Sequence, residues 1–228
     1  MPAFLSIVIP TLNSTKTIAP TLMSLSEGIT TGLIKELIIS DGNSTDAINE
    51  MCEEIGAILI NGQKGRGIQL HRGAMQAKGE WILFIHSDTV LPIGWTDAFF
   101  NHIKTKKKAG YCKLTFDEAS IKAKIVSTGA NLRSKFLKLP YGDQTLLISR
   151  KLYKGIGGYP DLPIMEDVSI AKLLKNNLDL IPINVKTSSK RYKQNGWFGQ
   201  SIKNLTLFIM FKLGVDPKKL AKIYNKYN

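Results

Sequence analysis

The sequence predicts an α/β protein with a mostly parallel, Rossmann-like sheet flanked by helices and a C-terminal helical appendage. Two observations support this class. Short apolar runs alternate with helix-like segments, and a chain of 228 residues with 43% hydrophobic content suits one sizeable core. We expect the α/β domain to cover residues 1–197. The appendage, packed on the domain or on a membrane surface, is expected to cover 198–228.

Four apolar runs predict the strands of the first half: Ser6–Ile9, Leu37–Ile39, Ala57–Ile60 and Trp81–Ile85. Runs that are apolar on both faces are typical of parallel strands covered on both sides. Helices are expected between them near 18–27, 46–55 and 68–77, with Asp46 capping the second. This alternation predicts a doubly wound sheet with right-handed crossovers.

The second half alternates less regularly. We expect helices at 96–104 and 118–138 (the latter broken near Gly129), strands at 110–116 and 145–148, a helical turn at 151–156 and a helix from about 165. The appendage is predicted to hold an apolar helix at 198–213 and a second helix from Pro217. The second helix has an apolar face opposite a row of lysines. The apolar positions are Leu220, Ile223, Tyr224 and Tyr227, and the lysines are Lys218, Lys219, Lys222 and Lys226.

The chain is strongly basic, with 31 Lys and Arg against 18 Asp and Glu and a formal net charge of +13. Such a charge favours anionic partners: nucleic acid, phosphorylated small molecules or acidic lipid surfaces. A solvated, lysine-rich surface explains part of the excess. Cys52 and Cys112 are far apart and lack a metal-ligand spacing, which fits reduced thiols in the cytosol. We find neither a signal peptide nor an apolar run of about 20 residues, so we expect a cytoplasmic protein.

Polar residues follow three of the predicted strands, where open α/β sheets bind ligands. Pro10, Thr11 and Asn13 end the first strand, Asp41 the second, and His86 and Asp88 the fourth. An aspartate after a strand often only forms a turn or caps a helix. The joint placement of Asp41 and Asp88 at the carboxyl ends of two strands instead favours a shared site.

Three further segments each allow two interpretations. The loop 62–67 is rich in glycine and carries Lys64 and Arg66, so it suits phosphate, although an ordinary tight connection has the same composition. Glu166 and Asp167 begin a helix, where acidic residues complement the helix dipole or supply a general base. Lys190-Arg191-Tyr192 is a solvated basic patch or a clamp on phosphate oxygens.

Together these motifs resemble family-2 glycosyltransferases of the GT-A fold over nearly the full chain. Four segments occur in the family's order and rough spacing: SIVIPTLN, LIISDGNSTD, KGRGIQLHRGAMQAKGEWILFIHSDT and GGYPDLPIMEDVSIAKLL. The details YGDQ, PIMED and GVDPKKLAKIY are most similar to a small bacterial subgroup named arsenosugar-biosynthesis glycosyltransferases.

The resemblance implies that Pro10, Thr11 and Asn13 line a nucleotide pocket in which Asp41 bonds the base. Arg66 and Arg72 would lie near the base and the diphosphate.

The resemblance also implies the chemical roles. Asp88 matches the last aspartate of the family's DXD signature, which holds Mn²⁺ or Mg²⁺ against the diphosphate, and Asp167 matches the catalytic base. Glu166 would shape the acceptor site, and Arg191 would meet the departing diphosphate. His86 replaces the first aspartate of the signature, and an imidazole ligand suits Mn²⁺ better than Mg²⁺. His86 either binds the metal or supports a residue that does.

The sequence thus predicts a hexosyltransferase-like enzyme that inverts the configuration of the transferred sugar. The donor would be a UDP- or GDP-linked sugar, and the hydroxyl acceptor a lipid or a small metabolite. The appendage suggests a peripheral contact with the inner face of the membrane. One alternative is a sugar-nucleotide nucleotidyltransferase, but the basic glycine-rich loop it needs after the first strand is missing from 10–16. A basic nucleic-acid-binding module is the other, yet no recognition motif supports nucleic acid as a partner.

Overall fold

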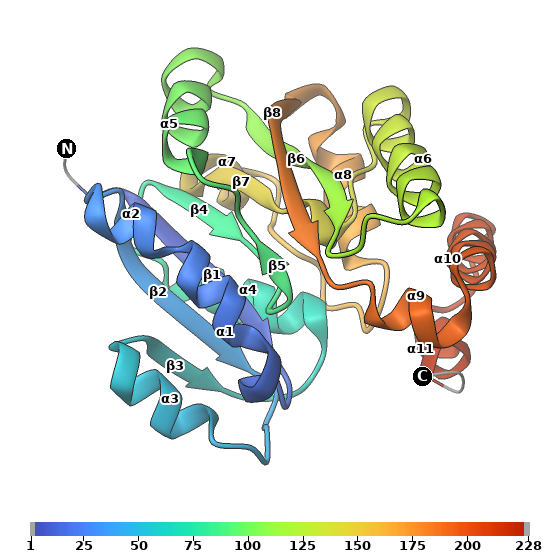
Figure 1. Ribbon diagram of the computed structural model, residues 1–228, viewed down its shortest axis with the longest axis horizontal. Helices are drawn as coiled ribbons and strands as arrows, with labels where there is room; N and C mark the ends of the chain where they lie inside the picture. The colour runs from blue at the N-terminus through green and yellow to red at the C-terminus, as the bar shows by residue number, and fades with distance from the viewer. Residues whose placement is uncertain (1–2, 226–228) are drawn as a thin grey trace.

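The computed structural model, which describes residues 3–225, confirms the α/β class. One eight-stranded sheet has the order β3-β2-β1-β4-β7-β6-β8-β5 (Figure 1). Its strands are β1 (Leu5–Thr11), β2 (Ile34–Asp41), β3 (Ile58–Asn61), β4 (Trp81–Phe84), β5 (Thr89–Val90), β6 (Ala109–Phe116), β7 (Leu146–Ser149) and β8 (Leu178–Thr187).

The helices flank the sheet and account for the predicted helical segments. They are α1 (Thr15–Ser24), α2 (Ser26–Thr30), α3 (Ile48–Ile55), α4 (Arg66–Gln76), α5 (Trp95–Lys106), α6 (Ile121–Leu137), α7 (Arg150–Gly155), α8 (Glu166–Leu174), α9 (Lys190–Asn195), α10 (Trp197–Lys212) and α11 (Pro217–Asn225). A short 3-10 turn, η1 (Gly142–Gln144), precedes β7.

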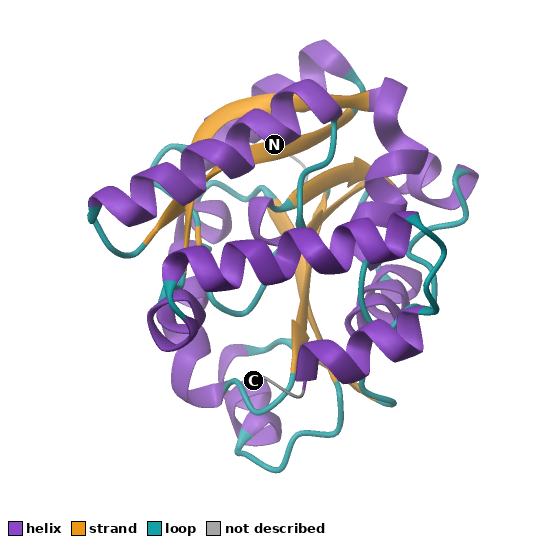
Figure 2. Ribbon diagram, turned by 90° about the vertical axis from the view of Figure 1, so that its right-hand side faces the viewer, coloured by secondary structure: helices purple, strands orange, loops and turns teal. Residues whose placement is uncertain are grey.

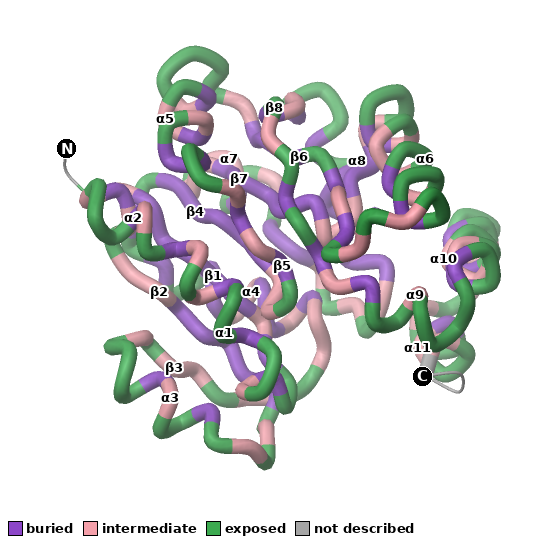
Figure 3. Tube along the Cα trace, in the orientation of Figure 1, coloured by how far each residue is buried: buried purple, intermediate pink, exposed green. Residues whose placement is uncertain are grey.

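The four strands of the first half are parallel, as predicted from their apolar runs. Strand β1 shows why these runs are continuous. Ile7 and Ile9 belong to the apolar cluster on one face of the sheet, whereas Val8 belongs to the cluster on the other face. Because each such side chain is removed from water, its burial stabilises the fold by roughly 1.5–3 kcal/mol. Figure 3 shows the central strands as buried along most of their length.

The second half of the sheet reverses one strand. β7 is antiparallel to β4 and to β6, whereas β8 is parallel to β6. Leu146, the first residue of β7, therefore lies beside Phe84, the last residue of β4. The loops that follow β1, β2, β4, β6 and β8 consequently meet the turn η1 at a single edge of the sheet.

The C-terminal helices pack on the domain. Leu207, Phe208 and Leu220 are buried against Val168 and Ala171 of α8. Asp216 caps α11, because its Oδ1 accepts a hydrogen bond from the Lys218 N–H at 2.8 Å. The predicted positions Lys226 and Tyr227 lie outside the described residues. A domain boundary at 197/198 stays a prediction.

Three expectations about individual elements are wrong. Helix α6 runs unbroken through Gly129, and the segment 18–27 divides into α1 and α2 at Leu25. Asp46 does not cap α3; its Oδ2 instead accepts hydrogen bonds from the backbone N–H and the hydroxyl of Thr15 at the start of α1.

Two bulk properties are also visible in the structure. The thiols of Cys52 and Cys112 are both free and buried. Within residues 3–225, no helix combines the length and the apolar content that a membrane span needs.

Candidate active site

The loops after β1 and β2 are tied together by hydrogen bonds. Asp41 is buried, and its Oδ1 accepts hydrogen bonds from the hydroxyls of Thr11 at 2.8 Å and Ser44 at 2.5 Å. The backbone N–H of Asn13 donates to Ser44 Oγ at 2.7 Å. The structure thus places Pro10, Thr11, Asn13 and Asp41 together at the predicted edge. Their contacts with a nucleotide remain a prediction.

Gln69 connects the same loops, although it was not among the site residues predicted from the sequence. Its buried amide donates to the carbonyl oxygens of Thr11 at 2.7 Å and Ser40 at 2.9 Å, and its Oε1 accepts from the Gly65 N–H at 3.1 Å. One side chain of α4 therefore fixes the ends of two strands and the glycine-rich loop. A lone glutamine inside a helical pattern gives no sequence signal for this role.

Arg66 and Arg72, both in α4, contact different parts of the molecule. Arg72 donates to the carbonyl oxygens of Asp41 at 2.5 Å and Gln63 at 3.3 Å, so its guanidinium supports the loop backbone. Arg66 extends towards the start of α8, where its Nη1 lies 3.5 Å from Glu166 Oε1. The side chain of Arg66 is 40% exposed, whereas that of Glu166 is only 1% exposed. Arg66 thus remains accessible to an anionic ligand.

Glu166 and Asp167 are adjacent but have different partners. Burial raises the pKa of Glu166 to about 7, with Asp167 adding to the rise and Arg66 opposing it. Asp167 Oδ2 instead accepts a hydrogen bond from the Gly142 N–H at 3.1 Å, and its Oδ1 accepts from the Val168 N–H at 2.7 Å. Met165, which precedes the pair, holds a φ of 66° that non-glycine residues rarely adopt. The two carboxylates therefore have separate partners: Arg66 for Glu166, and backbone N–H groups for Asp167.

His86 and Asp88 lie on the loop after β4, close to the base candidate. The His86 ring packs against Gly142, where an added Cβ would lie only 2.4 Å from Nε2. Burial and the nearby Arg66 and Arg191 lower the pKa of His86 well below its ordinary value, so the imidazole is neutral. Asp88 keeps an exposed side chain, although partial desolvation raises its pKa against the opposing charges of the same two arginines.

Asp143 is a second residue that the sequence reasoning missed as a site residue. Its Oδ1 is buried and has no hydrogen-bond partner within the described part of the chain. Burial raises the pKa of Asp143 to about 6; Asp167 and Asp88 add to this rise, and Arg133 opposes it. The antiparallel direction of β7 brings Asp143 to this edge, and nothing in the local sequence predicted that direction.

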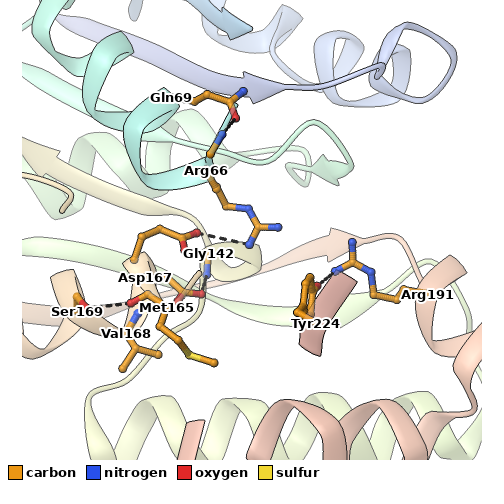
Figure 4. Close-up of polar contacts among 11 residues, drawn as sticks. Arg66, Gln69, Gly142, Met165, Asp167, Val168, Ser169, Arg191 and Tyr224 are labelled. Atoms are coloured by element: carbon orange, nitrogen blue, oxygen red, sulfur yellow. Dashed lines mark hydrogen bonds and ion pairs between the residues drawn. The ribbon is translucent and has the colours of Figure 1, made fainter. Parts of the chain in front are cut away.

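Arg191 closes the opposite side of the cleft. It lies in α9, directly after β8, and its guanidinium bonds the hydroxyl of Tyr224 and lies 5.3 Å from the centre of that ring. Figure 4 shows Arg66, Arg191 and Asp167 in one region of the molecule. Arg66 and Arg191 both act electrostatically on His86 and on Asp88, so two cations lie near this pair.

A divalent cation fits this cleft if a ligand supplies most of its oxygens. Within residues 3–225, no three His, Cys, Asp or Glu side chains gather into a metal site. Asp88 offers an exposed carboxylate and His86 a neutral imidazole. Mg²⁺ commonly binds through one or two carboxylates plus substrate phosphates. The donor set therefore fits a cation bound together with a diphosphate better than one bound alone.

The fold and site define an α/β enzyme class that handles a phosphorylated ligand at the carboxyl edge of its sheet. Comparison with known proteins gives the family. The model named "Glycosyl transferase family 2" matches residues 6–145, so the chain belongs to that family. The matched segment contains Asp41, Arg66 and Asp88 and ends before Glu166, Asp167 and Arg191.

Sequence relatives match only a part of this chain. Glucosyl-3-phosphoglycerate synthase of Mycobacterium tuberculosis is 31% identical over 97 residues, which are 39% of this chain and 30% of the relative. The corresponding protein of Mycolicibacterium paratuberculosis is 29% identical over 97 residues. The match thus spans less than a third of these curated relatives.

Solved structures support the GT-A fold. The Mycobacterium tuberculosis synthase, in complex with Mn²⁺, UDP and glucosyl-3-phosphoglycerate, has a TM-score of 0.56 and 20% identity, covering 80% of this chain and 70% of that one. Residues 1–349 of S. aureus TarS give a TM-score of 0.63 and 18% identity, covering 92% of this chain and 66% of that one. At these identities, the likeness concerns the fold.

Proposed function

We propose that this protein transfers a sugar from a UDP- or GDP-linked donor to a hydroxyl acceptor, with inversion at the sugar carbon. One observation carries the proposal. The carboxylate of Asp167 is held by the backbone N–H groups of Gly142 and Val168, and Arg66 lies close enough to Asp167 and to Asp88 to interact with both charges. A carboxylate base close to cations that can bind a diphosphate suits attack by a hydroxyl and departure of a diphosphate.

Each residue of the site has a separate role in the proposed transfer. Asp167 accepts the proton of the acceptor hydroxyl as its oxygen attacks the sugar carbon, and Arg66 and Arg191 bind the departing diphosphate. Glu166 holds Arg66 in place and borders the acceptor side. Asp88, with His86 as a ligand or as a support for the 141–144 loop, would hold Mn²⁺ or Mg²⁺. That cation, when bound, would neutralise charge on the leaving group.

One of the relatives named above is a synthase whose solved complexes contain phosphoglyceric acid. A small phosphorylated acceptor would also fit the basic surroundings of the site in this chain. The YGDQ, PIMED and GVDPKKLAKIY segments support membership of the arsenosugar-biosynthesis subgroup. We infer a cytoplasmic location, with a peripheral contact at the inner face of the membrane.

Calorimetry with UDP and GDP, with and without Mn²⁺, tests donor binding. The proposal predicts that one of the two nucleotides binds, and binds more tightly with Mn²⁺, because Asp88 and the diphosphate share the cation. Asp88→Ala should remove the Mn²⁺ enhancement and leave the folded state intact. The matched control is Asp179→Ala, near the start of β8 and away from the edge that carries the site. This variant should bind the nucleotide and Mn²⁺ like the unmodified protein. Equal affinity with and without Mn²⁺ in both unmodified protein and Asp88→Ala would contradict the metal assignment.

A further inference from the structure

Two neighbouring helices carry large apolar side chains on their outer sides. The residues are Ile121, Ile125, Leu132 and Phe136 of α6, and Phe198, Ile202, Leu205 and Ile209 of α10. Each of the eight side chains is between 47% and 77% exposed. We call this set the α6–α10 face. Single exposed apolar residues are ordinary on protein surfaces, but a set of eight on two touching helices is not.

The spacing shows that the exposed apolar residues of each helix lie along one side of it. In α6 they recur at intervals of four and seven, opposite the buried residues Ala123, Ser127 and Ser134. In α10 they recur at intervals of three and four, opposite the buried Leu207. The helices contact each other on the right-hand side of Figure 1, the side that Figure 2 turns towards the viewer. Both stripes are exposed, and they belong to helices on the same side of the molecule.

Basic residues surround this surface. Lys122 flanks the apolar stripe of α6 on one side, and Lys124 and Lys135 flank it on the other. Lys212 ends α10, and Lys218, Lys219 and Lys222 are exposed on α11. The sequences of α6, α10 and α11 contain no Asp or Glu. Apolar stripes flanked by lysines are typical of helices that lie in the interface of an anionic bilayer.

We propose that the α6–α10 face binds the surface of an anionic lipid bilayer, with the apolar stripes entering the headgroup region and the lysines contacting lipid phosphates. The charge pattern favours a bilayer over a second copy of the chain, because two copies facing each other here would bring like charges together. The expected membrane helices were 198–213 and the segment from 217. The structure instead buries Leu220 of α11 and supplies the second stripe from α6. This inference goes beyond the proposed transfer reaction and does not depend on it.

The test is co-sedimentation with vesicles of phosphatidylcholine alone and of phosphatidylcholine mixed with phosphatidylglycerol. The protein should sediment only with the anionic vesicles, and less so at high salt. Ile125→Glu combined with Ile202→Glu should abolish binding. Lys122→Ala combined with Lys135→Ala should weaken binding about 30-fold at low salt. Ile93→Glu, at a residue 99% exposed outside the face, is the matched control and should bind normally.

Circular dichroism and nucleotide calorimetry on each variant separate loss of the face from loss of the fold or of donor binding. Full recovery in the supernatant with both kinds of vesicle would overturn the proposal. Binding that survives the double Glu substitution would overturn it too, since charge alone would then be sufficient. A dimer in sedimentation velocity that the double Glu substitution dissociates would assign the face to a second copy instead.

Discussion

Two adjacent carboxylates illustrate how local surroundings separate the roles of residues of one chemical type. Side chains at neighbouring helical positions point about 100° apart, so the sequence alone predicts that Glu166 and Asp167 face different partners. It does not predict which partners. Arg66 and Gly142 are distant in sequence from the pair, and only the fold places them on either side of it.

Gly142 links the two halves of the site, because it contacts His86 and donates to Asp167. Gly142→Ala would place a methyl group 2.4 Å from His86 Nε2, so the His86 ring or the 141–144 loop must shift. We expect turnover to fall by up to about 100-fold, since a displacement near 1 Å at a catalytic group costs that much. Donor affinity should change little. Steady-state transfer or donor hydrolysis measures the effect.

Gly129→Ala is the control for this substitution. Gly129 lies in α6 with open space where its Cβ would be. That variant should keep full activity and raise the free energy of unfolding by roughly 0.5–1 kcal/mol, because alanine favours the helix. Full turnover in Gly142→Ala would show that the contact with His86 does not position Asp167.

At the scale of elements, the sheet divides into a predictable half and an unpredictable one. Strands β1 to β4 follow from their apolar runs, and β1 and β4 are buried along nearly their whole length. β8 was missed, since its sequence LDLIPINVKT is interrupted by Pro182 and its pairing with β6 shifts register. The direction of β7 also escaped prediction. Because β7 runs in the reverse direction, the loop before it lies at the edge where the parallel strands end. Asp143 lies in that loop and was therefore absent from the site predicted from the sequence.

Gln69 contributes to the site by connecting α4 to the ends of β1 and β2. Gln69→Leu keeps the shape of the side chain but removes its hydrogen bonds to the carbonyl oxygens of Thr11 and Ser40 and to the Gly65 N–H, while the Gly42 N–H still donates to Thr11. We expect the free energy of unfolding to fall by roughly 1–3 kcal/mol, since each lost hydrogen bond costs about 0.5–1.5 kcal/mol. Urea unfolding measures this loss. Gln76→Leu, at an exposed position of the same helix, should change it by less than about 0.5 kcal/mol. Equal stability of both variants would show that Gln69 does not brace the pocket.

At the scale of the whole molecule, the C-terminal helices take part in both the core and the cleft. Leu220 is fully buried against the domain, and Tyr224 of the same helix holds Arg191 beside the cleft. The sequence pattern predicts the helices and their caps. It leaves open whether their apolar residues turn inward or outward, because α10 has apolar residues on both sides.

The central claim is that loops from distant parts of the chain form one transfer site in which Asp167 is the base. The most direct test combines turnover and donor calorimetry on Asp167→Asn and Glu166→Gln, with donor hydrolysis as the readout until the acceptor is known. Asp167→Asn should lower turnover by roughly 10²–10⁴-fold, because asparagine cannot accept the proton, while donor affinity stays the same. Glu166→Gln should retain turnover and act mainly on acceptor affinity. Near-full turnover in Asp167→Asn together with an inactive Glu166→Gln would contradict the claim.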